Sequence, residues 1–94
     1  MRIDLALKYL CLAKSRSGVK TLCERSAITV NTRPAKASST IHVGDRISIG
    51  SPSGTLTIQL LDVPRKQLSK TLAPSYYEVI EDYSPPSAEH RPLD

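Results

Sequence analysis

The sequence predicts an α+β domain in which two amino-terminal helices precede a set of short strands. Up to about residue 24, apolar residues recur at three- and four-residue spacing, which is typical of helices that bury one face. After Ser26 the apolar spacing changes to two, and Gly, Pro, Asn and Asp stand between the short runs, as in strands joined by tight turns. The 94 residues suffice for one small domain.

Residues 1–14 (MRIDLALKYLCLAK) are predicted to form the first helix, with Asp4 placed to cap its amino end. One apolar stripe follows this helix: Ile3, Ala6, Leu7, Leu10 and Ala13. A second apolar group lies on the other side: Leu5, Tyr9 and Leu12. The first helix is therefore either covered on two sides or offers an apolar patch to a partner.

The second helix is predicted over residues 15–26, with Ser15 as its N-cap. Three residues at helical spacing should face the core: Val19, Leu22 and Cys23. Another three should follow an adjacent, solvent-facing side: Arg16, Lys20 and Glu24.

The rest of the chain alternates short strands and turns. Strands are predicted at 27–30, 40–43, 46–50 and 55–63, with turns at 31–34, 44–45 and 51–54. Residues 64–73 are basic and polar, with room for one helical turn, and 76–80 could be strand or helix. The last twelve residues, 83–94, carry three prolines and few apolar side chains, so they are expected to form a disordered tail.

Positive charge gathers near the amino terminus. The chain has 13 Lys and Arg against 9 Asp and Glu, a net charge of +4. Residues 1–36 hold eight of these cations against Asp4 and Glu24, a net charge of +6, whereas the remainder holds five against seven. Such asymmetry within one small domain indicates a face that meets a polyanion. A solvated basic surface without a partner is the alternative.

Arg16 and Lys20 lie in the first turns of the predicted second helix, where the helix dipole disfavours each cation by about 0.3–1 kcal/mol. Their four-residue spacing adds like-charge repulsion. Folding alone would favour acids here, so we expect a partner outside the chain to supply negative charge. At a helix start, Arg16 can bind two phosphate oxygens through its forked guanidinium. Arg33 and Lys36 would join it if the helices pack beside the 31–34 turn.

Residues 1–49 resemble the RNA-binding domain named after small-subunit ribosomal protein four, the S-four domain. The matching segments stand in the right order and spacing: Arg2-Ile3-Asp4, Leu7, Ser15-Arg16, ITVN (28–31), AKAS (35–38) and VGDRISI (43–49). The resemblance implies that two helices pack against a small antiparallel sheet, the αL motif, within residues 1–50. Residues 51–82 are then expected to extend and complete the sheet.

The resemblance also implies the RNA-binding residues. By position in the family pattern they are Arg2, Lys8, Lys14, Arg16, Lys20, Arg33 and Lys36. Leu5 and Cys11 depart from the pattern because basic residues are common at these positions. Ser26 and Thr32 stand where glycines are expected, and the β-branched Thr32 is the less suited to a positive φ.

The chain is most similar to the free-standing members of the family, which are the heat-shock S-four proteins and the S-four factor of bacterial ribosome-associated quality control. These share its amino-terminal pattern and its late YYEVI segment (76–80). The likeness implies a cytoplasmic, monomeric protein without catalysis that binds ribosomal RNA and tRNA on a large subunit holding peptidyl-tRNA. A tail-adding quality-control factor would be a further partner.

A protein–protein adaptor that uses Leu5, Tyr9 and Leu12 is the alternative function. Salt would separate the two, because phosphate contacts weaken steeply with ionic strength and apolar contacts hardly respond.

Other chemistry is not indicated. Cys11 and Cys23 have no CxxC spacing, and His42 and His90 lack ligand spacing, so neither a metal nor a cofactor is expected. No nucleophile–base pair, phosphate loop or paired carboxylates are recognisable, so we do not expect an enzyme. The absence of a signal peptide or long apolar run favours the cytoplasm.

Two later groups stay open. Arg65, Lys66 and Lys70 could extend an RNA-binding surface or only aid solubility. Tyr76 and Tyr77 could pack over the sheet or stack on bases.

Overall fold

The computed structural model describes residues 1–51 and 54–83, and eight elements make up this part of the chain. They are helices α1 (Ile3–Tyr9) and α2 (Arg16–Glu24), strands β1 (Ile28–Val30), β2 (Arg33–Pro34), β3 (Arg46–Ser51) and β4 (Gly54–Leu60), the 3-10 helix η1 (Ala73–Tyr76) and strand β5 (Tyr77–Tyr83). Apart from Tyr83, which ends β5, the predicted tail lies outside the described residues.

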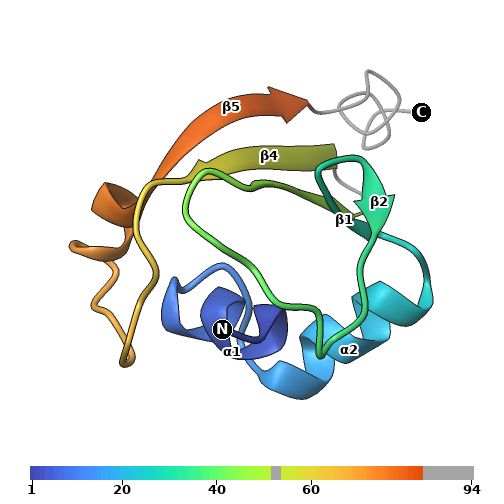
Figure 1. The fold of residues 1–94 in the computed structure, drawn as a ribbon, viewed down its shortest axis with the longest axis horizontal. Coiled ribbons are helices and arrows are strands. Elements are labelled where there is room, and N and C mark those ends of the chain that lie inside the picture. Colours follow the sequence, from blue (N-terminus) through green and yellow to red (C-terminus); the bar gives the residue numbers. More distant parts are fainter. Residues whose placement is uncertain (52–53, 84–94) are drawn as a thin grey trace, which may run out of the picture.

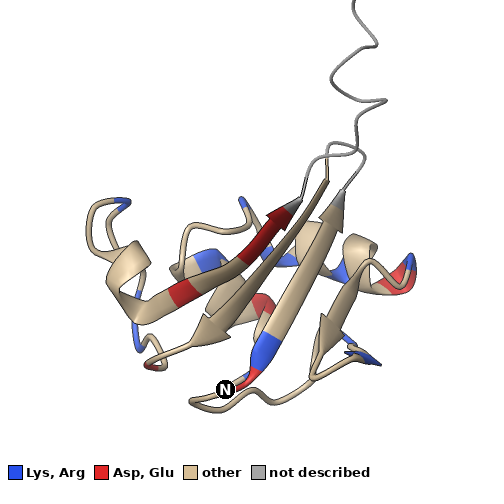
Figure 2. Cartoon of the chain, turned by 90° about the horizontal axis from the view of Figure 1, so that it is seen from above, with Lys and Arg blue, Asp and Glu red and all other residues tan. Residues whose placement is uncertain are grey.

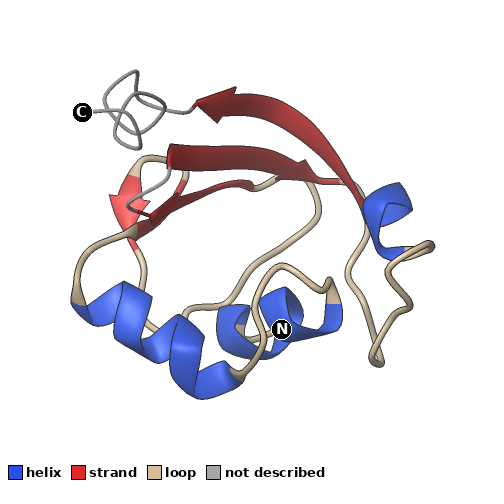
Figure 3. Ribbon diagram, turned by 180° about the vertical axis from the view of Figure 1, so that it is seen from behind, coloured by secondary structure: helices blue, strands red, loops and turns tan. Residues whose placement is uncertain are grey.

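The five strands form one antiparallel sheet in the order β2-β1-β3-β4-β5. Both helices lie on the same face of this sheet (Figures 1 and 3). The predicted α+β architecture of two helices against a small antiparallel sheet is therefore confirmed. The segment 76–80, for which strand and helix were both open, belongs mostly to β5, and one turn of 3-10 helix precedes it.

An aliphatic core fills the space between helices and sheet. Its largest fully buried apolar side chains are Ile3, Leu7, Leu10, Val19, Ile28, Ile41, Ile47, Ile58, Leu60 and Pro64. Leu22 and Cys23 pack against this core beside the buried Val19, as the spacing in α2 predicts. Tyr76 and Tyr77 pack against it as well.

α1 ends at Tyr9, five residues before the predicted end. Two residues after this end, Cys11 adopts a φ of +61°. The amide of Cys11 donates to the Lys8 carbonyl at 3.1 Å, and that of Leu12 to the Leu7 carbonyl at 3.0 Å. This is the Schellman pattern that closes a helix. The chain reversal, and not a longer helix, keeps Leu12 against the core.

α2 begins as predicted, with the Ser15 hydroxyl accepting a hydrogen bond from the Gly18 amide at 3.1 Å. A second Schellman closure ends it at Ser26, whose φ is +56°. There the Ser26 amide donates to the Cys23 carbonyl at 3.0 Å, and the Ala27 amide donates to the Leu22 carbonyl at 2.9 Å. The expectation that this position favours glycine is confirmed by its backbone.

A two-residue turn joins β1 to β2. Asn31 and Thr32 have φ values of +51° and +71°, as in a type I′ hairpin turn. The predicted turn at 31–34 is therefore too long, because residues 33–34 already form β2. The Asn31 side chain accepts from the Arg46 amide at 3.0 Å and donates to Asp45 at 3.1 Å, which ties the hairpin to the start of β3.

The strand predicted at 40–43 is wrong. Only Thr40 pairs, in an isolated bridge with Arg2. Because α1 begins at Ile3, the extended chain before it is too short to pair further. Ile41 is buried and its amide donates to the Met1 carbonyl at 2.9 Å, so this segment anchors the amino terminus instead.

Candidate nucleic-acid interface

The amino end of α1 is closed by a loop and not by a capping side chain. Arg2, at the N-cap position, makes no side-chain capping bond. The amides of Ile3 and Asp4 donate to carbonyls of residues 37–39, at 2.8 and 3.2 Å. The Leu5 amide donates to Oδ1 of Asp4 at 2.7 Å. Asp4 is therefore not the N-cap that was predicted, because the loop supplies most of the acceptors that the first turn needs.

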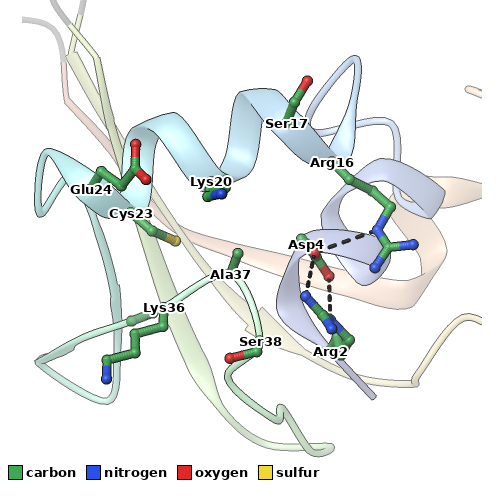
Figure 4. A pocket seen from close by; sticks show the side chains of 11 residues that line it. Arg2, Asp4, Arg16, Ser17, Lys20, Cys23, Glu24, Lys36, Ala37 and Ser38 are labelled. Carbon is green, nitrogen blue, oxygen red and sulfur yellow. Dashed lines mark hydrogen bonds and ion pairs between the residues drawn. The ribbon is translucent and has the colours of Figure 1, made fainter.

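Asp4 instead joins two of the predicted RNA-binding residues. Its carboxylate is buried, with 4% of the residue exposed. Nε and Nη2 of Arg2 donate to Oδ1 and Oδ2 at 3.2 and 3.1 Å. Nε of Arg16, at the start of α2, donates to Oδ2 at 3.4 Å. Figure 4 shows the two guanidinium groups on either side of this carboxylate.

These contacts determine the charge of Asp4. Burial alone would raise the pKa of the carboxyl. The hydrogen bonds from Arg2 and the Leu5 amide, together with the charges of Arg16 and Arg2, outweigh burial and hold the pKa below its usual value. Asp4 is therefore ionised throughout the neutral range.

A groove of about 510 Å³ opens beside this ion pair, between the start of α1, the outer side of α2 and the loop after β2. Its lining residues are Arg2, Asp4, Arg16, Ser17, Lys20, Cys23, Glu24, Ala35, Lys36, Ala37 and Ser38. Four of the seven predicted RNA-binding residues thus meet in one place (Figure 4). We call this surface the helix groove.

The cations of the helix groove keep donors for a ligand. The side chains of Arg2 and Arg16 are 51% and 48% exposed, and Arg16 uses only Nε in its ion pair. Lys20 and Lys36 are exposed, and neither forms an ion pair within the described part of the chain. Arg16 therefore has an internal acidic partner, contrary to the expectation that its negative charge comes from outside the chain, whereas Lys20 forms no ion pair among the described residues.

Lys8 and Lys14 lie on a different surface. They line a second pocket, of about 400 Å³, with Cys11, Leu12, Ala13, Gln67 and Lys70. Residues 67–68 dock there on the end of α1, since the Leu68 amide donates to the Tyr9 carbonyl at 3.0 Å. Nζ of Lys8 donates to Oε1 of Gln67 at 3.3 Å. We call this the lysine pocket, and no carboxylate lines it.

The sequence does not decide the role of Lys70 and gives no signal for Gln67. Only the fold of residues 61–72 brings them to α1, and no local pattern could have indicated this. Arg33, in β2, lines neither the helix groove nor the lysine pocket. Acidic side chains gather at the opposite edge of the sheet, where β5 carries Glu78, Glu81 and Asp82 (Figure 2).

The described residues contain no group of three His, Cys, Asp or Glu side chains that could hold a metal ion. Burial raises the pKa of the Cys23 thiol, and the charges of Asp4 and Glu24 raise it further. This cysteine of the helix groove is therefore protonated at neutral pH and a poor nucleophile.

The apolar group suggested for an adaptor is only half exposed. Leu5, Tyr9 and Leu12 are all of intermediate burial, and Leu12 packs on the core. Within residues 1–51 and 54–83, no helix is long and apolar enough to cross a membrane.

Comparison with known families now bears on this geometry. The family model of the S4 domain matches residues 1–47, half of the chain, which include α1, α2, β1, β2 and the start of β3. The chain belongs to the S4 domain family. The resemblance read from the sequence is thereby confirmed, and the helix groove lies wholly within the matched S4 residues.

Curated relatives extend the similarity beyond the S4 domain. A protein of Halalkalibacterium halodurans named RQC P-site tRNA stabilizing factor is 35% identical over 79 residues, which are 84% of this chain and 89% of the relative. The protein of the same name from Bacillus subtilis is 28% identical over 82 residues, with 87% and 94% coverage. The similarity thus covers most of this chain and most of each relative.

A solved structure supports the fold. Heat Shock Protein 15 of Vibrio cholerae, described as trimeric, superposes with a TM-score of 0.78 over 84% of this chain and 80% of its own. The two sequences are 22% identical, so this likeness concerns the architecture of the S4 protein alone.

Proposed function

We propose that this S4 protein is a non-catalytic RNA-binding factor that acts in the cytoplasm in ribosome-associated quality control or in rescue of stalled subunits. Its targets would be structured ribosomal RNA and tRNA on a large ribosomal subunit that carries peptidyl-tRNA. The observation that carries this proposal is the helix groove, where four cations from three segments converge inside the S4 domain. Phosphate contacts of this kind recognise folded RNA by its shape.

The proposed contact residues are those that the sequence indicated: Arg2, Lys8, Lys14, Arg16, Lys20, Arg33 and Lys36. Four of them line the helix groove and two line the lysine pocket, while Arg33 lines neither, so the molecule has two basic surfaces for two RNA segments. The names of the relatives, which refer to tRNA in the ribosomal P site, agree with this function. We further propose that the protein acts as a monomer and alongside a tail-adding factor.

Binding to purified large subunits that carry peptidyl-tRNA tests the proposal. The full chain should cosediment with them, and its affinity should fall by about 0.7–0.9 log units per phosphate contact for each log unit of salt. Lys20→Glu combined with Lys36→Glu should abolish binding without unfolding the protein, because neither lysine has an internal acidic partner in the described structure.

Arg25→Glu with Arg46→Glu is the matched control. It changes the net charge equally, but Arg25 and Arg46 line neither basic surface. If the two double variants bind equally well, the helix groove is not the RNA site. An affinity for subunits that does not change with salt concentration would favour the apolar adaptor over RNA recognition.

A further inference from the structure

A third pocket lies outside both basic surfaces. It has a volume of about 310 Å³, and its lining residues are Asp62, Val63, Arg65, Lys66, Leu68, Leu72 and Tyr76. The walls are mostly apolar, yet Leu72 remains 48% exposed at this site. An exposed leucine beside a half-buried tyrosine ring, flanked by two cations, is suited to a flat apolar ligand with a negative charge.

We propose that this pocket binds an unpaired guanine nucleotide of the RNA. The inference rests on the proposed RNA-binding function and adds a site and a ligand to it. Volume is the first argument, because pockets for small ligands begin at about 300 Å³.

The backbone holds the two chemically useful residues of the pocket side by side. The carbonyl of Tyr76 accepts hydrogen bonds from the amides of Leu61 and Asp62, at 2.8 and 3.1 Å. These bonds fix the spacing between the backbones of Tyr76 and Asp62. Because both residues line the same pocket, we expect a base stacked on Tyr76 to present its edge to Asp62.

Asp62 indicates which base fits. Its Oδ1 accepts from the Val63 amide at 2.8 Å, and within the described structure it forms no ion pair with Arg65 or Lys66, although all three line the pocket. The carboxylate thus keeps acceptor capacity. Guanine presents two adjacent donors, N1–H and the 2-amino group, that a carboxylate can accept together. Uracil offers one donor on this edge, and adenine and cytosine offer only their amino group.

Charge favours RNA over an apolar protein segment. Arg65 and Lys66 are exposed at the pocket, and Lys70 of the same segment lines the lysine pocket. An RNA strand bound along Lys8, Lys14 and Lys70 would therefore continue toward cations, with one base free to enter.

Titration of the full chain with guanosine 5′-monophosphate, followed by NMR, tests the inference. The NMR signals of the Tyr76 ring and the Asp62 amide should shift together, with half-saturation at about 1 mM. Inosine monophosphate, which lacks the 2-amino group, should bind about threefold to tenfold more weakly, as should adenosine and uridine monophosphates. Equal responses to all four nucleotides, or to inorganic phosphate alone, would overturn the guanine assignment.

Variants separate the groups. Tyr76→Leu should lose the interaction and Tyr76→Phe should keep it, since only the ring is needed for stacking. Asp62→Asn, at an exposed position, should remove the preference for guanosine over inosine without unfolding the chain. Arg25→Gln, at a residue that lines none of the three pockets, is the control and should leave the titration unchanged.

The two proposals fail independently. A protein that binds guanosine monophosphate but no ribosomal subunit would contradict the proposed function alone. A protein that binds subunits but shows no shift of the Tyr76 signals with guanosine monophosphate would overturn the guanine site. That result is expected if the pocket serves an apolar side chain of a protein partner instead.

Discussion

The buried carboxylate of Asp4 and the guanidinium of Arg16 link α1 to α2, with Nε of Arg16 3.4 Å from Oδ2 of Asp4. The same carboxylate binds Arg2 at 3.1 Å. One acid thus positions two arginines whose side chains stay 51% and 48% exposed, which leaves N–H groups available to phosphate. In this S4 protein, the geometry of the helix groove and the stability of the helix pair therefore depend on one side chain.

Replacing Asp4 with Asn should lower the stability at pH 7 by about 1–3 kcal/mol, because two cations lose a buried partner. The difference should shrink in acid. The pKa of Asp4 is lowered in the folded state, so its stabilisation is fully present above about pH 4, the pKa of an unfolded Asp, and is lost as the pH falls through the lower folded value. Urea unfolding at pH 7 and at about pH 2.5 measures both differences, and equal values would contradict the charge argument.

Charge reversal should affect two neighbouring residues of α2 differently. The helix dipole favours an acid at either position. Arg16→Glu nevertheless brings a carboxylate beside the buried Asp4 and should cost about 1–2 kcal/mol. Lys20→Glu places its new carboxylate beside no buried acid, so it should change stability by less than about 0.5 kcal/mol. Thermal unfolding compares the two variants, and identical midpoints would show that the Asp4–Arg16 pair contributes nothing.

This difference between Arg16 and Lys20 also shows where sequence reasoning ends. The helix start at Ser15 was predictable because capping is local, and the buried side of α2 followed from its period. The ion pair of Arg16 was not, since it depends on how α1 crosses α2. The early end of α1 was missed for a similar reason: Cys11 gives no local signal for the left-handed backbone that it adopts.

The candidate site was predictable to the extent that its residues lie in the helices and the loop that follows β2. Arg2, Arg16, Lys20 and Lys36 converge as the charge distribution and the S-four resemblance indicated. The separation of Lys8 and Lys14 from them could not be inferred, because it depends on residues 61–72 docking at the end of α1. Long-range packing of this kind has no periodic signature in a sequence.

Thr32→Gly should stabilise the fold by about 1 kcal/mol. Thr32 has a φ of +71°, which costs an L-residue with a branched Cβ about 1–2 kcal/mol. Glycine removes this strain, but its greater conformational freedom in the unfolded chain offsets part of the stabilisation. Thr32→Ala, which keeps the Cβ, should gain much less. Urea midpoints measure the series, and an equal gain for alanine would mean that backbone strain is not the cause.

Lys70→Gln should weaken binding to ribosomal subunits and flatten its dependence on salt. If Lys70 contacts one phosphate, the slope of log affinity against log salt should lose about 0.7–0.9. Arg25→Gln removes one charge outside both basic surfaces, so it should leave the slope almost unchanged. Equal slopes for the two variants would mean that only overall charge matters. A change confined to Lys70 would instead place RNA on the lysine pocket, a surface that exists because the segment beyond the S4 match folds back onto α1.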